Sequence, residues 1–195
     1  DQRWKPTLPN AVYERRSSGN KTTNDVRTSN NSNMSSPAYF CPPAAARLGT
    51  MEREDVVDYL DEDEGFVAIG STYHDIGMIW GARLITPNGL FAADNATAPN
   101  GDSISRHIVF MTDGLLSINQ ETYTPYGIQW WDRRVTTSTN NSTVHDRHAA
   151  RFQSACRQAR AENISVWVVA FGTSLSQNLI DCATPGRAYH AEDSE

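Results

Sequence analysis

An acidic residue ends the most strand-like apolar stretch of this chain. Residues 106–114 (RHIVFMTDG) contain the apolar run 109–111, and Asp113 follows it directly before Gly114. An apolar run without polar alternation is typical of a strand that is buried on both faces of a sheet. Ligands of open α/β sheets bind just outside the carboxyl ends of the strands. The carboxylate of Asp113 is therefore the first candidate for binding or catalytic chemistry.

Thr72 is a second candidate, because it stands at the start of a predicted helix over residues 72–84. Asp75 follows three residues later, which resembles a capping box, so a role as helix N-cap is the simpler interpretation of Thr72. A hydroxyl and a carboxylate are also hard oxygen donors that suit Mg²⁺. If both residues face the same end of a sheet, Thr72 and Asp113 predict part of a metal site.

Strand and helix patterns alternate along the part of the chain that positions these residues. The expected elements are helices over 51–60, 72–84, 144–162 and 174–180, and strands over 107–112, 164–171 and 187–191. This alternation predicts an α/β fold with a parallel sheet. In the helix over 72–84, the spacing of Ile76, Ile79, Trp80 and Leu84 predicts that these residues face inward.

The remaining motifs carry less weight. His145 and His148 stand three apart at the expected start of a helix, and we expect them to be solvated residues rather than metal ligands. The acidic run 61–64 is expected to be a solvated helix end or loop, because four adjacent carboxylates do not converge on one point. The phosphate-binding and nucleophile motifs of common enzyme families are absent from the sequence.

Composition excludes some classes of function. A net charge of −6 argues against nucleic acid as a partner, since phosphate binding is driven by clustered Lys and Arg. The sequence contains no apolar run of about 18 residues, so no transmembrane helix is expected within it. Residues 1–40 are expected to form an irregular segment, because the polar stretch 17–36 offers little apolar surface to offset its ordering entropy. The second expected region covers residues 41–195.

The three cysteines leave two interpretations open. In a reducing compartment Cys41, Cys156 and Cys182 would be small buried residues. In an oxidising compartment an odd number indicates one disulfide and one cysteine whose partner lies outside this sequence.

Several segments resemble a known family in the same order along the chain. GSTYHDIG and HIVFMTDG resemble the second and third metal-ligating motifs of the von Willebrand factor type A (vWA) domain. More narrowly, the chain resembles the TadG-like proteins of bacterial Tad (Flp) pilus assembly, including an insertion that those proteins carry. The resembling segments are RWKPTLPNAVYERR, CPPAAARL, TYHDIGMIWGARLITPNGLF, SISRHIVFMTDG, YGIQWWDRRV and NISVWVVAFGTSL…CATPGRAY.

The resemblance implies a fold and a site. The fold would be a Rossmann-like vWA domain, a three-layer sandwich around a parallel sheet. Residues 41–195 would be its later part, with the first strand and helix expected before Asp1 and a closing helix after Glu195. The site would be a metal-ion-dependent adhesion site with Thr72 and Asp113 as ligands of Mg²⁺ or Mn²⁺. Its Asp-x-Ser-x-Ser motif is absent here and expected upstream, so the site is expected to be complete only in the intact protein.

The resemblance also implies a function and a location. The expected function is non-enzymatic binding of a protein partner, either a pilus or envelope component or a host surface. The expected location is the periplasmic or extracellular side of the bacterial cell envelope, with an inner-membrane anchor outside this sequence. Cys156 and Cys182 would then form a disulfide, and Cys41 would pair with an upstream cysteine.

Two alternatives belong to other classes of protein. One is a metal-dependent hydrolase that uses Asp113 and His74 at the strand ends, which requires a general base and a metal-activated water in one pocket. The other is a purely structural envelope module in which Thr72 only caps a helix.

Overall fold

A computed structural model describes residues 12–14, 26–28, 46, 49–61, 71–120, 123–129, 133–138 and 140–192 of the 195-residue chain. The chain divides into two compact units, Asp1–Gly70 and Ser71–Glu195. Most of the expected irregular segment 1–40 lies outside the described residues, as do Cys41 and residues 62–64 of the acidic run.

The described part of the first unit contains two short strands and one helix. Strands β1 (Val12–Glu14) and β2 (Val26–Thr28) pair antiparallel. Helix α1 (Arg53–Tyr59) confirms the helix expected over 51–60. Its first turn is closed by the Asp55 carboxylate, which accepts a hydrogen bond of 3.1 Å from the Glu52 N–H.

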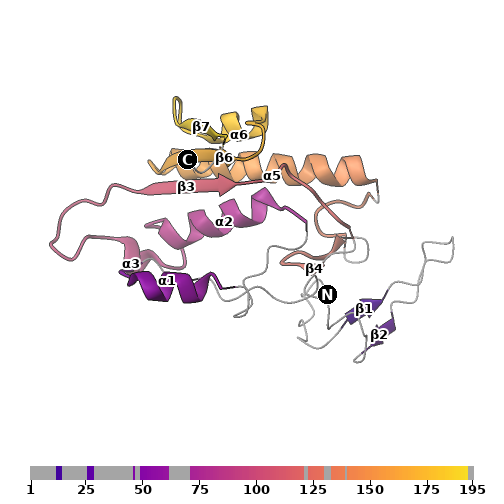
Figure 1. Cartoon of the computed structure of the whole chain (residues 1–195), viewed down its shortest axis with the longest axis horizontal. Coiled ribbons are helices and arrows are strands. Elements are labelled where there is room, and N and C mark those ends of the chain that lie inside the picture. Colours follow the sequence, from indigo (N-terminus) through magenta and orange to yellow (C-terminus); the bar gives the residue numbers. More distant parts are fainter. Residues whose placement is uncertain are drawn as a thin grey trace. The chain divides into compact units, whose positions relative to one another are not determined.

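The second unit is a mixed α/β structure around a parallel sheet (Figure 1). Its helices and strands are α2 (His74–Ile85), α3 (Ala92–Asn95), β3 (His107–Thr112), β4 (Tyr123–Thr124), β5 (Gly127–Ile128), α5 (Asn141–Ala161), β6 (Ser165–Phe171), α6 (Gln177–Cys182) and β7 (Ala188–Ala191). The expected strands over 107–112, 164–171 and 187–191 are confirmed as β3, β6 and β7. The expected helices over 72–84, 144–162 and 174–180 are confirmed as α2, α5 and α6, with shifted ends.

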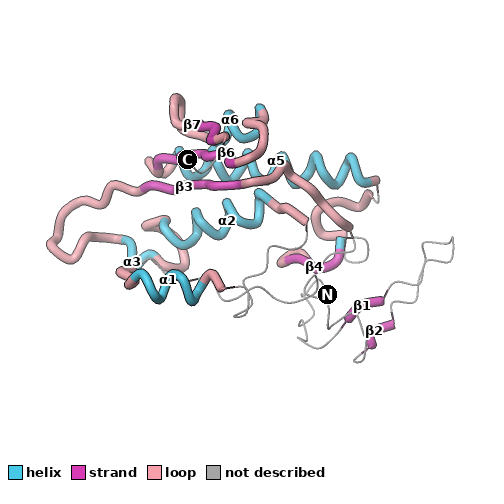
Figure 2. Tube along the Cα trace, in the orientation of Figure 1, coloured by secondary structure: helices cyan, strands magenta, loops and turns pink. Residues whose placement is uncertain are grey.

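The three parallel strands lie in the order β3-β6-β7, with β6 in the centre (Figure 2). His107 pairs with Ser165 at the start of β3, and Thr112 pairs with Ala170 at its end. On the other side of β6, Val168 pairs with Ala188. The small antiparallel pair β4-β5 is separate from this sheet. Since the strands are parallel, their carboxyl ends meet at one edge of the sheet, where Asp113 follows β3.

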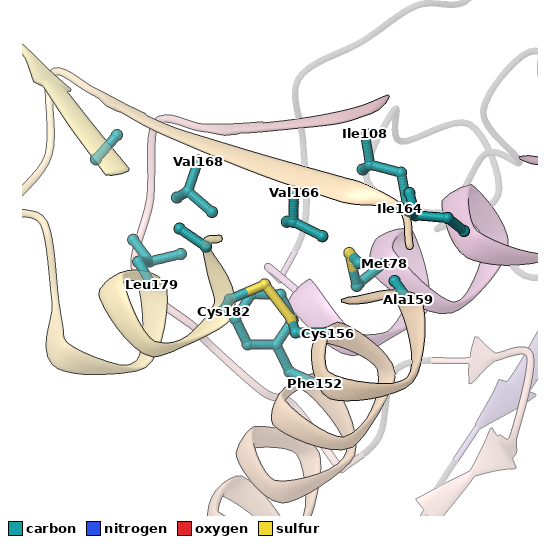
Figure 3. Packing of buried hydrophobic residues seen from close by; sticks show 12 residues of the cluster. Met78, Ile108, Phe152, Cys156, Ala159, Ile164, Val166, Val168, Leu179 and Cys182 are labelled. Carbon is teal, nitrogen blue, oxygen red and sulfur yellow. A yellow bond between two sulfur atoms is a disulfide. The ribbon is translucent and has the colours of Figure 1, made fainter. Parts of the chain in front are cut away.

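One face of the sheet is covered by helices and forms the core (Figure 3). Ile108, Val166 and Val168 project from the strands toward Phe152 on α5 and Leu179 on α6, and all five side chains are buried. The stripe along α5 continues through Cys156 and Ala159 as the spacing predicts. Burial of this stripe holds the helices on the sheet.

The opposite face of the sheet is exposed, so the prediction that the strands are buried on both faces is wrong. Val109 and Met111 on β3 keep 63% and 66% of their surface exposed, and Phe171 on β6 keeps 38%. Side chains alternate between the two faces of a strand. In the described residues, α2, α5 and α6 contribute to the core on one face only. The described part of the sheet therefore shows two layers.

A row of rings crosses this uncovered face. The indole Nε1–H of Trp167 on β6 donates to Nδ1 of His107 on β3 at 3.1 Å. Tyr189 on β7 stacks near Trp167, with ring centroids 6.1 Å apart, and the Arg187 guanidinium lies 4.2 Å from the centre of the Trp167 ring. These contacts connect side chains of all three strands on the uncovered face.

A disulfide joins α5 to α6. Cys156 and Cys182 are bonded with an S–S distance of 2.06 Å, and both are completely buried. Beside it, Arg160 on α5 donates to the carbonyl oxygens of Asp181 (2.9 Å) and Cys182 at the end of α6. These carbonyls have no partner within their own helix, and a cation at this end is favourable. The expected pairing of Cys156 with Cys182 is thus present in the structure.

None of the helices in the described ranges combines the length and apolar character needed to cross a membrane.

Candidate functional site

Thr72 does not cap the helix that follows it, so the N-cap prediction is wrong. Helix α2 begins at His74, with Tyr73 at the N-cap position and no capping side chain. Thr72 instead forms an isolated antiparallel bridge with Ser117. The Thr72 N–H donates to the Ser117 carbonyl at 2.8 Å, and the Ser117 N–H donates to the Thr72 carbonyl at 3.0 Å. The loop after β3 is therefore attached to the residue that precedes α2.

This bridge brings the Thr72 hydroxyl close to Asp113. A Cβ atom built on Gly114 would lie 3.5 Å from Thr72 Oγ1, so the hydroxyl faces Gly114, the residue that follows Asp113. The Asp113 side chain itself is exposed. Thr72 and Asp113 thus lie at the same end of the sheet, just beyond the carboxyl end of β3.

The end of β3 is held in a tight turn by Thr112. The Thr112 hydroxyl donates to the Gly114 carbonyl at 2.9 Å and accepts from the Gly114 N–H at 3.2 Å. These two bonds enclose Asp113 between Thr112 and Gly114. Short side-chain hydrogen bonds to the backbone two residues on are typical of threonine turns.

His74 is buried at the start of α2 and contacts the same turn. Its Nε2 lies 3.1 Å from the Gly114 carbonyl oxygen and 3.3 Å from Thr112 Oγ1. Because a carbonyl oxygen only accepts, Nε2 carries the proton and donates a hydrogen bond to the Gly114 carbonyl. Burial lowers the pKa of His74, although the bond to Gly114 and the nearby Asp75 carboxylate oppose this shift.

The lowered pKa of His74 predicts a loss of stability in acid. The unfolded chain takes up the imidazole proton more readily than the folded one. The stabilising contribution is therefore complete above the unfolded pKa of about 6.5 and is lost as pH falls from there through the lower folded pKa. We expect His74→Gln to flatten the fall in unfolding free energy between about pH 7 and pH 5. Urea unfolding at several pH values measures this, and equal slopes for both proteins would contradict it.

Tyr73 binds the backbone of the segment after β3 at a second position, Asn119. Its hydroxyl donates to the Asn119 carbonyl at 2.7 Å and accepts from the Asn119 N–H at 3.0 Å. Burial raises the pKa of Tyr73, while its bond to the Asn119 backbone opposes the shift. The phenol therefore stays neutral and able to serve as both donor and acceptor.

Asp75 and His148 form a buried pair that the sequence analysis missed. Asp75 Oδ2 accepts a hydrogen bond of 2.9 Å from His148 Nδ1, and the two residues are 0% and 1% exposed. The expectation that His148 is solvated is therefore wrong. His148 lies four residues before Phe152 and eight before Cys156, on the inward stripe of α5. That spacing was a signal of burial that was available in the sequence.

Aromatic rings surround this pair. The Tyr73 ring meets the His148 ring edge-on at 5.0 Å, and the Tyr126 ring lies 5.9 Å from it. The Arg151 guanidinium lies 4.8 Å from the centre of the Tyr126 ring. Burial raises the pKa of Tyr126, and the Asp75 carboxylate adds to this shift. The pair is thus enclosed by side chains from α2, α5 and the β4-β5 turn.

The donors at the end of β3 fit a hard divalent cation in type but not in number. The Thr72 hydroxyl and the Asp113 carboxylate are suitable oxygen donors for Mg²⁺ or Mn²⁺. Over the part of the chain that the structure describes, His, Cys, Asp and Glu form no group of three that could hold a metal ion. Two donors do not satisfy octahedral coordination, so further ligands are required.

No contact of the described residues favours the hydrolase alternative. Of the two residues that this alternative uses, His74 is buried with its Nε2 bonded to the Gly114 carbonyl, whereas Asp113 is exposed. A general base must reach the proton that it abstracts.

Comparison of the chain with protein-family models, curated proteins and solved structures found no match in any of the three.

Proposed function

We propose that this chain is a non-enzymatic, protein-binding vWA module of a TadG-like protein of Tad (Flp) pilus assembly. The observation that carries the proposal is the Thr72–Ser117 bridge, which lays the Thr72 hydroxyl against Gly114, beside Asp113. Two residues that the resemblance names as ligands are 41 positions apart in the sequence, yet they lie at one end of a parallel strand. Ligand sites of open α/β sheets are found at this edge.

The fold and the disulfide support the same proposal. The sheet order β3-β6-β7 with helices on one face is compatible with the later part of a Rossmann-like vWA domain. In this proposal a third layer and the strand beside β3 are contributed by segments outside residues 71–192. The buried Cys156–Cys182 bond is compatible with an oxidising compartment, as expected on the outer side of the inner membrane.

In this proposal the metal site is completed only in the intact protein. Thr72 and Asp113 would supply two oxygen donors to Mg²⁺ or Mn²⁺, and an upstream Asp-x-Ser-x-Ser motif would supply the others. The bound cation would accept an acidic oxygen of a partner protein, such as a pilus or envelope component or a host surface protein. That is binding chemistry, and it requires no general base.

We expect Asp113→Asn to weaken Mg²⁺ binding by the intact protein at least about tenfold, because even outer-shell changes at metal sites cost that much. Isothermal titration with Mg²⁺ alone measures the effect. The matched control is Asp146→Asn, which removes another exposed carboxylate, from α5. Equal Mg²⁺ affinity in the two variants would contradict the assignment of Asp113.

Thr72→Ala separates the binding proposal from a purely structural role. The Thr72 hydroxyl caps no helix, so its loss is expected to change the unfolding free energy by less than about 0.5 kcal/mol. In the proposed site the same change weakens Mg²⁺ binding. A loss of stability near the 1 kcal/mol typical of a removed cap, with unchanged Mg²⁺ binding, would favour the structural module.

A further inference from the structure

Three consecutive residues at the start of α2 each hold a different part of the second unit. Tyr73 binds the backbone of Asn119, His74 binds the turn that ends β3, and Asp75 binds His148 on α5. Residues 113–119 are called here the Asp113 loop. Tyr73 and His74 bind this loop, and Asp75 connects the start of α2 to α5, the longest helix of the unit.

The contact with α5 is the most deeply buried of the three. Asp75 and His148 are almost without exposed surface and are joined at 2.9 Å. The Asp75 carboxylate also interacts with the Tyr126 hydroxyl, and loss of the bond to His148 removes its hydrogen bond to α5 in a site with no exposed surface. The pair therefore joins the first turn of α2 to α5 by a directional bond in addition to the apolar packing between these helices.

Two backbone N–H groups of the Asp113 loop donate hydrogen bonds to the residues that precede α2. The Ser117 N–H donates to the Thr72 carbonyl at 3.0 Å, and the Asn119 N–H donates to the Tyr73 hydroxyl at 3.0 Å. Both acceptors belong to the two residues that precede α2. If the first turn of α2 shifts, these two bonds open together.

We propose that Asp75 and His148 are positioning residues for the Asp113 loop. The pair anchors the first turn of α2 on α5, and Thr72 and Tyr73 transmit that position to the loop through their bonds to Ser117 and Asn119. The spacing between the Thr72 hydroxyl and Gly114 then depends on His148, a residue on another helix. The importance of this spacing for metal and partner binding rests on the proposed function. The effect of His148 on the geometry of the loop is independent of that function.

The test is native-state hydrogen exchange on the whole chain without metal or partner. In His148→Leu, which cannot donate to Asp75, we expect the Ser117 and Asn119 amides to exchange about tenfold faster or more, relative to Val168 in β6. The Val168 N–H bonds to Arg187 in the centre of the sheet and serves as the core reference. His148→Gln retains a donor and is expected to restore most of the protection.

Two further variants keep the test decisive. Leu179→Ala opens the core at α6, and there the exchange of the loop relative to Val168 should not rise. Tyr73→Phe removes only the hydroxyl that binds Asn119, and it should accelerate the Asn119 amide but not Ser117. This variant tests the bond that transmits the position of α2 to the loop, and it leaves the Asp75–His148 pair intact. A uniform rise at loop and core in His148→Leu, or no rise at Asn119 in Tyr73→Phe, would overturn the proposal.

This result is independent of the Mg²⁺ titration. If the loop responds to His148 but Asp113→Asn binds Mg²⁺ normally, the positioning role stands and the metal proposal fails. If Mg²⁺ binding depends on Asp113 but exchange in the loop is unchanged in His148→Leu, the metal proposal stands and the positioning role fails.

Discussion

Replacing Cys156 and Cys182 together by alanine is expected to lower the free energy of unfolding by roughly 3.5 kcal/mol. The two cysteines are separated by 26 residues, and their bond removes the loop-closure entropy of that segment from the unfolded chain. Both side chains are completely buried between α5 and α6, so their replacement also removes apolar contacts from the core. Urea denaturation of the variant and the oxidised protein measures the difference.

Reduction gives the internal control for this prediction. The buried disulfide is out of reach of a thiol reagent in the folded state, so reduction requires opening of the α5-α6 contact. The protein that has been unfolded, reduced and refolded should show a denaturation midpoint below that of the oxidised protein and no lower than that of the alanine variant, because it keeps the buried cysteine side chains. An alanine variant with the midpoint of the oxidised protein would show that the bond contributes nothing to stability.

Phe152→Ala is expected to cost about 3–5 kcal/mol of unfolding free energy. Phe152 is 1% exposed, and its ring packs 5.1 Å from that of Phe110 and 5.4 Å from that of His74. Truncation leaves a cavity between the sheet and the start of α2, which the surrounding elements fill only in part. Because His74 lines that cavity, we expect its contact with Gly114 to loosen as well.

Two further substitutions serve as controls for the loss of stability in Phe152→Ala. Phe152→Leu keeps much of the volume and should cost clearly less than the alanine change. Arg157→Ala removes an exposed side chain from the same helix and should stay within about 0.5 kcal/mol. If Phe152→Ala lost no more stability than Arg157→Ala, the described core around Phe152 would be wrong.

The elements of the second unit were predictable because each has a strong local pattern. The continuous apolar runs in β3 and β6 and the long apolar stripe of α5 hold over enough residues to identify strands and a helix. What such a run does not show is how many faces of the strand are covered. Val109 and Met111 continue the apolar run of β3 but lie on the exposed face.

The orientation of α2 was predicted incorrectly for a related reason. Its inward side carries His74, Asp75 and Met78, and two of these three residues are polar. Hydrophobic spacing therefore selects another face, where Trp80 and Leu84 are 42% and 39% exposed, although Ile76 and Ile79 are half-buried as expected. Buried polar residues satisfied by distant partners are invisible to a local pattern.

The candidate site was predictable only in part. The end of β3 directed attention to Asp113, and the resemblance added Thr72 and the disulfide. The Thr72–Ser117 bridge and the Asp75–His148 bond join residues 45 and 73 positions apart, and one sequence has no signal for such a pairing. Only the position of His148 on the stripe of α5 pointed to its burial.

The strand order also implies an order of folding. Twenty residues separate Val168 from its partner Ala188, whereas 58 separate His107 from Ser165. Closing the longer loop costs about 1 kcal/mol more in chain entropy. We therefore expect the β6-α6-β7 unit to form before β3 joins the sheet. On that expectation the end of β3, where Thr72 pairs with Ser117, is completed after the β6-β7 pairing.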